Sequence, residues 1–118
     1  MKCITNSSEK DEDLKGLTEK WKKRIVNEKG YSEDTAMCYA RKLWKLAKYM
    51  QYGYAIIAYY KRDGTFQMVT ATLTPYDKEF NHPYDIYQVR SAFTYWNVES
   101  GGWRTFQIEN FLEWKPMI

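Results

Sequence analysis

An arginine flanked by aromatic residues is the position in this sequence where residue types and spacing best suit contact with a ligand. Arg104 lies between Trp103 and Phe106 in a segment of alternating, β-rich residues. A guanidinium donates hydrogen bonds in a planar fork that fits phosphate or carboxylate, and an adjacent indole ring can stack on a base. The alternative is that the Arg104 stem covers an aromatic neighbour while its head reaches Glu99 or Asp85.

Tyr95 and Trp96, in the segment before Arg104, extend this aromatic set. Together with Trp103 they would offer a platform on which the bases of a single strand could stack. Neighbouring residues of a strand point to opposite faces, so at least one of Tyr95 and Trp96 belongs to the core. A stacking platform and an entirely buried aromatic core both fit the pattern.

Basic residues concentrate in the first half of the chain. Residues 1–50 carry 12 basic and 8 acidic side chains, residues 51–118 carry 6 and 7, and residues 20–48 carry 9 and 3. Such clustering is the electrostatic footprint of a polyanion binder, although a solvated helix face has the same composition. The predicted nucleic-acid contact comprises Arg41, Lys42, Lys45, Lys48, Lys61, Arg62, Arg90, Tyr95, Trp103 and Arg104. The first helical segment offers Lys20, Lys22, Lys23 and Arg24 in addition.

Support for catalysis is weak. The one histidine, His82, precedes Pro83, and no serine or cysteine has an evident base partner. No group of His, Cys and Asp has the spacing of metal ligands, and Gly101-Gly102 fits a hairpin turn rather than a phosphate loop. We therefore expect a protein that is not an enzyme and that uses neither a metal nor a cofactor.

Composition indicates one small intracellular domain. The chain has 118 residues, of which 44% are hydrophobic and 18% aromatic. This is enough to form a hydrophobic core without stabilising disulfides or metal ions. No apolar run approaches the ~20 residues of a membrane span, and the polar N-terminus has no secretory h-region. Cys3 and Cys38 are expected to be reduced thiols. These features predict a cytoplasmic protein without a membrane partner.

Two helices are predicted before residue 52. Apolar residues recur at helical spacing from Leu14 to Ile25, and Gly30 suits the end of that helix. Ser32 is placed to cap a second helix, with Glu33 and Asp34 in its first turn. The apolar stripe of this helix consists of Ala36, Tyr39, Ala40, Leu43, Leu46, Ala47 and Met50.

Two β-hairpins are predicted after residue 53. Asp63-Gly64 lies between two alternating runs, and a two-residue loop would set Ala58 opposite Val69. This register assigns to the core face Ile56, Ala58, Val69, Ala71 and Leu73. It assigns to the other face, partly under the second helix, Ile57, Tyr59, Phe66 and Met68. The second hairpin joins residues 90–98 and 103–108.

Residues 74–89 are predicted to form a long irregular excursion, of the kind that is functional or mobile in compact domains. A single 3₁₀ turn at 109–111 and a closing strand at 112–115 would follow. The predicted organisation is a disordered or frayed tail at 1–13, a helical extension at 14–52 and a β-domain at 53–118.

The order of these elements, with KRDGTFQMVTATL and YWNVESGGWRTFQIENFL, resembles small phage and mobile-element proteins with an SH3 β-barrel fold, related to the Sm-like barrel of WYL domains. The resemblance covers about residues 32–115. Matching positions are Lys61, Asp63, Gly64, Thr65, Tyr95 to Glu99, Gly102, Trp103, Arg104 and Phe106, with Thr35–Gln51 as the family's helix. Phe66-Gln67 replaces an Ile-Arg pair of the family, which removes one basic residue. The resemblance implies an α+β fold with N-terminal helices followed by a small five-stranded SH3-like or Sm-like β-barrel.

Two functions are compatible with these features. The favoured one is a nucleic-acid-binding or regulatory accessory protein of phage or mobile-element origin, in which basic helices attract the polyanion and the aromatic hairpin contacts it. The other is an adaptor that binds a protein or a small ligand, such as a host factor or a nucleotide signal. Exposed aromatic residues on strands would also allow a homodimer through strand edges.

Overall fold

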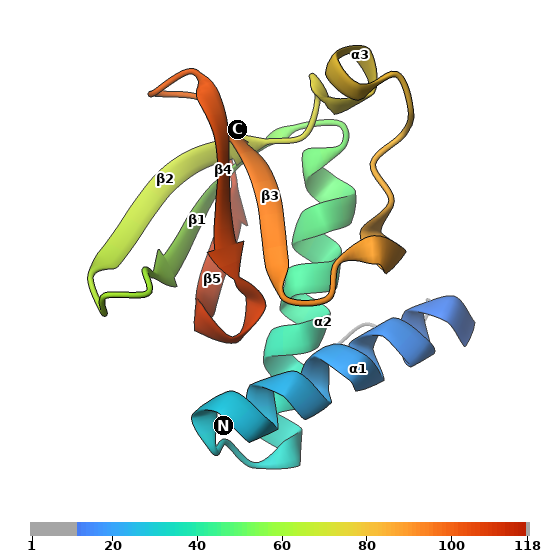
Figure 1. Cartoon of the computed structure of the whole chain (residues 1–118), viewed down its shortest axis with the longest axis vertical. Helices are drawn as coiled ribbons and strands as arrows, with labels where there is room; N and C mark the ends of the chain where they lie inside the picture. Colours follow the sequence, from blue (N-terminus) through green and yellow to red (C-terminus); the bar gives the residue numbers. More distant parts are fainter. Residues whose placement is uncertain (1–11, 118) are drawn as a thin grey trace.

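Two helices precede a curled five-stranded sheet in this computed structural model, which describes residues 12–117 (Figure 1). The tail predicted at 1–13 lies almost wholly outside these residues. Helix α1 (Glu12–Lys29) ends before Gly30, whose φ of +70° is the left-handed conformation expected after a helix, and the Gly30 N–H donates to Val26. The α1 prediction is confirmed, with the start two residues earlier.

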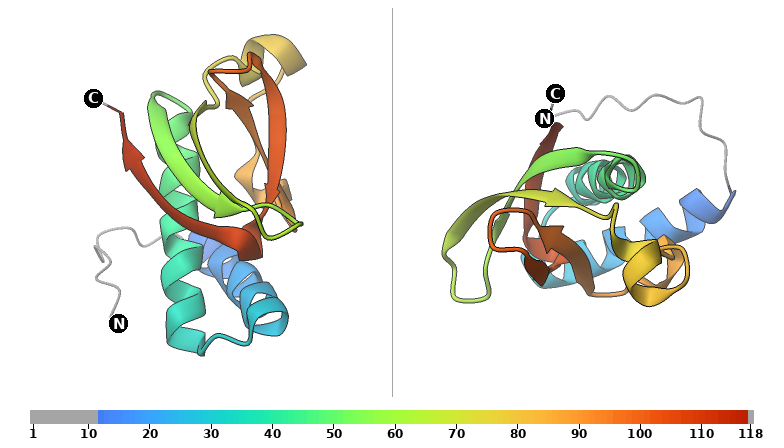
Figure 2. Two further views of the ribbon diagram at one scale, coloured as in Figure 1. Left: turned by 90° about the vertical axis from the view of Figure 1, so that its left-hand side faces the viewer. Right: turned by 90° about the horizontal axis from the view of Figure 1, so that it is seen from above.

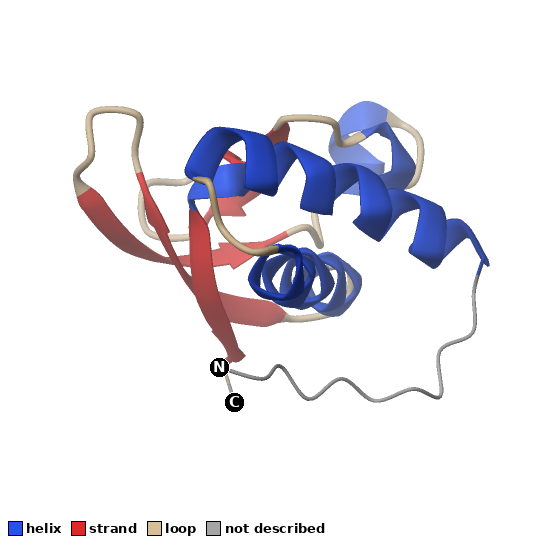
Figure 3. Ribbon diagram, turned by 90° about the horizontal axis from the view of Figure 1, so that it is seen from below, coloured by secondary structure: helices blue, strands red, loops and turns tan. Residues whose placement is uncertain are grey.

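Helix α2 (Glu33–Met50) begins as predicted at Ser32, whose hydroxyl accepts a hydrogen bond from the Thr35 N–H at 3.2 Å. Its apolar stripe is buried except for the partly buried Tyr39, and Trp44 joins it. The helix contacts α1 on one side and strands of the sheet on another, so it forms the middle of the molecule (Figure 3).

Removal of the α2 cap should weaken the fold measurably. Ser32→Ala leaves a donor of the first turn without its side-chain acceptor, so we expect the free energy of unfolding to fall by about 1 kcal/mol. Urea denaturation followed by circular dichroism at 222 nm measures this. Ser100→Ala, in an exposed turn, is the control; an equal loss in both variants would contradict a capping role for Ser32.

Strands β1 (Tyr54–Tyr60) and β2 (Phe66–Thr72) form the first hairpin, but its predicted register is wrong by one residue. Ile57, not Ala58, lies opposite Val69. The loop has three residues, because Gly64 N–H donates to Lys61 C=O while Lys61 N–H donates to Thr65 C=O. Gly64, at φ +87°, supplies the left-handed residue that ends such a loop.

A shift of one residue reverses the faces of β1. Ala55, Ile57 and Tyr59 are buried, whereas Ile56 and Ala58, predicted for the core, lie on the outer face. The predictions for β2 hold on the inner side, where Val69, Ala71 and Leu73 are buried. Phe66 and Met68 are 49% and 59% exposed, so α2 does not cover them as predicted.

The second hairpin joins β3 (Ala92–Asn97) to β4 (Gly102–Gln107), and η2 (Ile108–Asn110) leads into β5 (Phe111–Pro116). All pairings among the described strands are antiparallel, in the order β4-β3-β2-β1-β5. The sheet curls around a core of aromatic and aliphatic side chains, and α2 covers its open side (Figure 2). The predicted α+β fold, with helices before a five-stranded barrel-like sheet, is confirmed.

The excursion at 74–89 is more ordered than predicted. It contains the short helix α3 (Tyr76–Phe80) and the 3₁₀ helix η1 (Ile86–Gln88), which Asp85 caps by accepting from the Tyr87 N–H at 3.0 Å. Ile86 and Val89 anchor its second half in the core. The segment is therefore a structured cover beside β3 and β4.

Cys38 is disulfide-bonded, so the prediction of a reduced thiol is wrong for this residue. The chain's other cysteine, Cys3, lies outside the described residues. Between residues 12 and 117, no helix combines the length and apolar character that crossing a membrane requires.

Candidate nucleic-acid interface

Arg104 is exposed on β4, where it stands opposite Tyr95 of β3. Its guanidinium Nη1 donates to the carbonyl of the neighbouring Trp103 at 2.9 Å. A Cβ built on Gly102 would lie 2.7 Å from the same Nη1, so the side chain folds back along its own strand over a glycine. This contact differs from the predicted alternative, in which the head reaches Glu99 or Asp85. Arg104 can still swing toward a phosphate, because the bond it would give up is exposed.

Tyr95 is not a stacking residue, contrary to the prediction. Its side chain is 1% exposed, and its hydroxyl shares a 2.7 Å hydrogen bond with the Tyr59 hydroxyl. The ring packs on Phe106 with 5.9 Å between centroids. Burial, followed by the Tyr59 hydrogen bond, raises the pKa of the Tyr95 hydroxyl far above its usual range. Tyr95 thus belongs to the polar centre of an otherwise apolar core.

Trp103 is partly buried beneath the aromatic residues of the excursion. Its ring lies 5.3 Å from Phe80, 5.6 Å from Tyr76 and 5.3 Å from Trp96, centroid to centroid. Of the predicted platform, Trp103 is therefore covered by residues of α3. The aromatic residues of 76–84 are evident in the sequence, but nothing in the sequence indicates that they pack on Trp103.

The cations of α2 divide between internal contacts and solvent. Lys42 donates to Glu113 of β5 at 2.9 Å, and Lys48 lies 4.8 Å above the Trp44 ring. Arg41 and Lys48 are exposed, and Lys45 is partly buried on the same side of the helix. Part of the predicted contact set therefore joins α2 to the sheet rather than facing a ligand.

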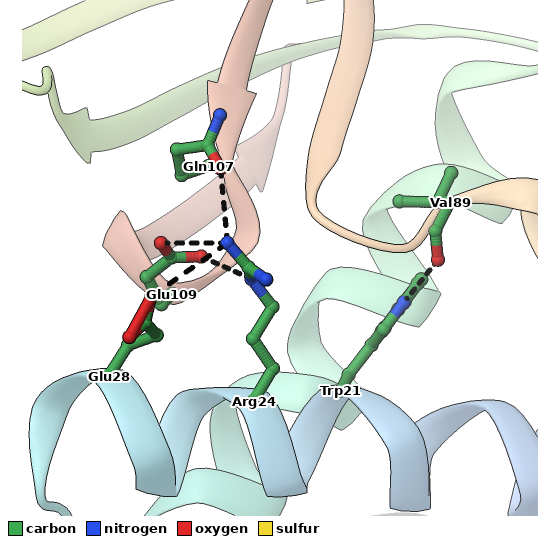
Figure 4. A network of polar contacts seen from close by, with 6 residues as sticks. All are labelled: Trp21, Arg24, Glu28, Val89, Gln107 and Glu109. Atoms are coloured by element: carbon green, nitrogen blue, oxygen red, sulfur yellow. Dashed lines mark hydrogen bonds and ion pairs between the residues drawn. The ribbon is translucent and has the colours of Figure 1, made fainter.

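Two of the additional cations on α1 are likewise engaged within the fold. Arg24 donates from Nε to Glu109 at 2.9 Å and from Nη2 to Gln107 at 3.4 Å, which ties α1 to the end of β4 and to η2 (Figure 4). The hydrogen bond with Glu109 raises the pKa of Arg24. Lys22 pairs with Glu19 and Glu33. Lys20 and Lys23 are exposed.

The tip of the β1–β2 hairpin places two exposed cations next to two exposed rings. Lys61 and Arg62 lead out of β1, and Tyr60 and Phe66 face each other across the strands with 6.0 Å between ring centroids. Tyr60 is 42% and Phe66 49% exposed. Asp63 is an exposed carboxylate in the same loop; it accepts from the Thr65 N–H at 2.9 Å, and this interaction with Thr65 lowers the pKa of Asp63.

Sequence reasoning included Lys61 and Arg62 but missed both rings, because the register error placed Phe66 under the second helix. The predicted contact residues occupy three separate places: the exposed side of α2, the β1–β2 tip, and β3–β4 with the exposed Arg90 before them. The tip lies well away from α2 in both views (Figures 1 and 2). Basic and aromatic groups thus meet on an open surface at the tip. Within residues 12–117, no three His, Cys, Asp or Glu side chains are grouped so as to hold a metal ion.

Helices before a curled antiparallel sheet in the order β4-β3-β2-β1-β5 define a small barrel of the SH3 and Sm-like class. The chain belongs to the WYL_2 family, described as having a Sm-like SH3 beta-barrel fold, whose model matches residues 43–112. The match begins within α2 and ends in β5, so α1 lies outside it. No curated protein and no solved structure matches the chain. Membership of this family supports a regulatory or binding accessory role.

Proposed function

We propose that the chain is a non-enzymatic accessory protein, of phage or mobile-element origin and acting in the cytoplasm, that binds single-stranded nucleic acid on the β1–β2 hairpin. The observation that carries this proposal is the pair of exposed rings, Tyr60 and Phe66, beside Lys61 and Arg62 at the tip. Stacking on aromatic rings combined with cations for the backbone is how proteins bind single strands without sequence preference.

The exposed cations elsewhere would supply longer-range attraction. Lys20, Lys23, Arg41 and Lys48 are exposed on the two helices, and Arg104 and Arg90 are exposed around β3–β4. Cations of this kind raise the rate of encounter with a polyanion and give no sequence specificity. In this proposal the β1–β2 tip contacts the nucleic acid, and the cations of the helices attract it from a distance.

Fluorescence anisotropy of a labelled oligothymidine at about 50 and 300 mM salt tests the proposal. Phe66→Ala should weaken binding by roughly 5- to 150-fold, since stacking of one base contributes about 1–3 kcal/mol. Lys61→Ala with Arg62→Ala should lower the slope of log K against log salt by about 1.4, two phosphate contacts at ~0.7 each. Binding of the unchanged protein to duplex should be weaker.

Lys78→Ala is the control, because Lys78 is an exposed cation on α3, away from the tip. It should leave both the affinity and the salt slope of the tip contact nearly unchanged. Absence of binding at the lower salt, or equal effects of Lys78→Ala and the tip variants, would remove the proposal.

One observation favours a second candidate, an adaptor that binds a small ligand. Trp103 Nε1 and the Tyr84 hydroxyl are both buried without a hydrogen-bond partner among residues 12–117, and both rings pack edge-on against Tyr76. Buried polar groups left unpaired cost about 1–3 kcal/mol each, and displacement of α3 would expose both to a ligand that can accept or donate. A small molecule retained in native mass spectrometry of protein purified from cells would support this candidate.

A further inference from the structure

Among the residues that the structure describes, none pairs with the first half of β2 on the side away from β1. Strand β3 pairs with β2 only at Ala71 and Thr72, and the backbone of Thr70 is satisfied by the Val98 N–H and the Glu99 carboxylate of the β3–β4 turn. The segment 66–69 extends beyond that turn. It runs along the hairpin toward a tip that projects from the body of the molecule (Figure 2).

The direction of the backbone groups follows from these bonds. Thr70 bonds toward β3, so the N–H and C=O of Met68 and Phe66, two and four residues earlier, also point away from β1. The hydrogen bond from the Lys61 N–H to the Thr65 carbonyl supports the same assignment. It makes Lys61 and Thr65 a hydrogen-bonded pair of the hairpin. Since such pairs alternate, Tyr60 and Phe66 form a pair without backbone hydrogen bonds between them. Phe66 and Met68 thus present four backbone groups to solvent along one edge.

This edge lacks the features that usually prevent strand pairing. Proteins protect such edges with lysine, proline, a bulge or a covering segment. The sequence Phe66-Gln67-Met68-Val69 has no charge and no proline, its pairing with β1 is regular, and Phe66 and Met68 are 49% and 59% exposed. An uncharged, apolar and regular edge of this kind favours another strand over water.

We propose that two copies of this chain associate by antiparallel pairing of their β2 edges about a two-fold axis at Gln67. In this register Phe66 of each copy faces Met68 of the other, and each such pair exchanges two hydrogen bonds, giving four in all. The pairing is isologous, since the same segment serves both copies, and a closed dimer results. The five-stranded sheets would join into one ten-stranded sheet.

The side chains suit this register. Phe66 and Met68 both lie on the outer face, so each copy places a thioether beside the other copy's phenyl ring, a favourable contact. The tip of one copy, with Lys61 and Arg62, then lies end-on to the β3–β4 turn of the other, which carries Glu99. At each end of the paired segment a tip of net charge +1, with Lys61 and Arg62 against Asp63, therefore lies near Glu99. The proposal does not depend on nucleic-acid binding, and its test contains no nucleic acid.

Sedimentation velocity of the protein from roughly 10 µM to 1 mM tests the association. A reversible monomer–dimer equilibrium is expected. Met68→Pro removes an outward N–H without removing a bond to β1, and symmetry removes two hydrogen bonds per dimer, so the dissociation constant should rise roughly 10- to 100-fold. Phe66→Lys should have at least the same effect, because it removes the ring that faces Met68 of the other copy and places a lysine, a residue that protects natural edges from pairing, on each edge.

Tyr54→Lys is the matched control, since Tyr54 is 44% exposed on the same outer face but lies opposite Thr72, where β2 is already paired with β3. It should leave the equilibrium unchanged. Hydrogen exchange gives a second measurement: the Met68 amide should become protected as concentration rises. Circular dichroism verifies that each variant folds. If Met68→Pro does not fold, the effect of Phe66→Lys on the equilibrium decides the test. A monomer at every concentration, or a dimer unaffected by the edge variants, would overturn the proposal.

Discussion

Trp21→Ala should lower the free energy of unfolding by about 3–5 kcal/mol, the largest effect we expect from one substitution. The indole is 1% exposed, and its Nε1 donates to the Val89 carbonyl at 2.9 Å (Figure 4). One side chain therefore joins α1 to the end of the 74–89 excursion, 68 residues later. Truncation removes the buried area and leaves a buried carbonyl without its donor.

Urea denaturation followed by circular dichroism measures this loss, and two further variants separate its causes. Trp21→Phe keeps most of the apolar volume but removes the donor, so a loss of about 1–3 kcal/mol is expected from the unpaired carbonyl. Trp96→Ala is the control, because Trp96 is only partly buried and should cost less. An unfolding curve for Trp21→Ala that coincides with the unchanged protein would show that α1 is not part of the cooperative unit.

The hairpin at β1–β2 shows where sequence reasoning is accurate and where it fails. Asp63-Gly64 locates the turn correctly, because a glycine at φ +87° is needed there. The same dipeptide fits both a two-residue loop and a three-residue loop ending in glycine. The choice between them depends on pairing across the whole hairpin, and a difference of one residue exchanges the inner and outer faces of β1.

Helices were predicted more accurately because their determinants are local. The cap of α2 lies within three residues of Ser32, and its stripe follows from a fixed period. By contrast, Arg24 finds Glu109 across 85 residues, and Tyr95 finds Tyr59 across 36. Composition identifies these side chains as basic or aromatic, but only the folded topology decides which of them serve the core.

The consequence for the candidate site is a redistribution of roles among the predicted residues. In the structure Tyr95 lies in the core, Trp103 is covered by Phe80, and Lys42 forms an ion pair with Glu113. Lys61 and Arg62 lie beside the rings of Tyr60 and Phe66. The sequence predicts Phe66 under the second helix and assigns no role to Tyr60. The solvent exposure of each side chain determines whether it can contact a ligand, and this exposure depends on contacts between residues far apart in the sequence.

The buried Tyr59–Tyr95 pair predicts a sensitivity to alkaline pH. Burial raises the pKa of Tyr95 in the folded protein, whereas an unfolded chain titrates its tyrosines near pH ~10. Above that pH the unfolded state has released a proton that the folded state still binds. Stability is therefore fully present below pH ~10 and falls above it, by up to about 1.4 kcal/mol per pH unit for this group. Burial raises the pKa of Tyr84 as well, with the same sign.

Tyr95→Phe should make the alkaline loss shallower, by up to about 1.4 kcal/mol per pH unit between pH 10 and 11, because the variant has no proton to retain. The same variant should be less stable at pH 7 by about 1–3 kcal/mol, since the Tyr59 hydroxyl then lies buried without its partner. Tyr59→Phe combined with Tyr95→Phe should recover part of that loss. Urea unfolding at each pH measures both quantities, with Tyr54→Phe, at an exposed position, as the control. Equal pH slopes for Tyr95→Phe and Tyr54→Phe would mean that the Tyr95 hydroxyl titrates in the folded protein as it does in the unfolded chain.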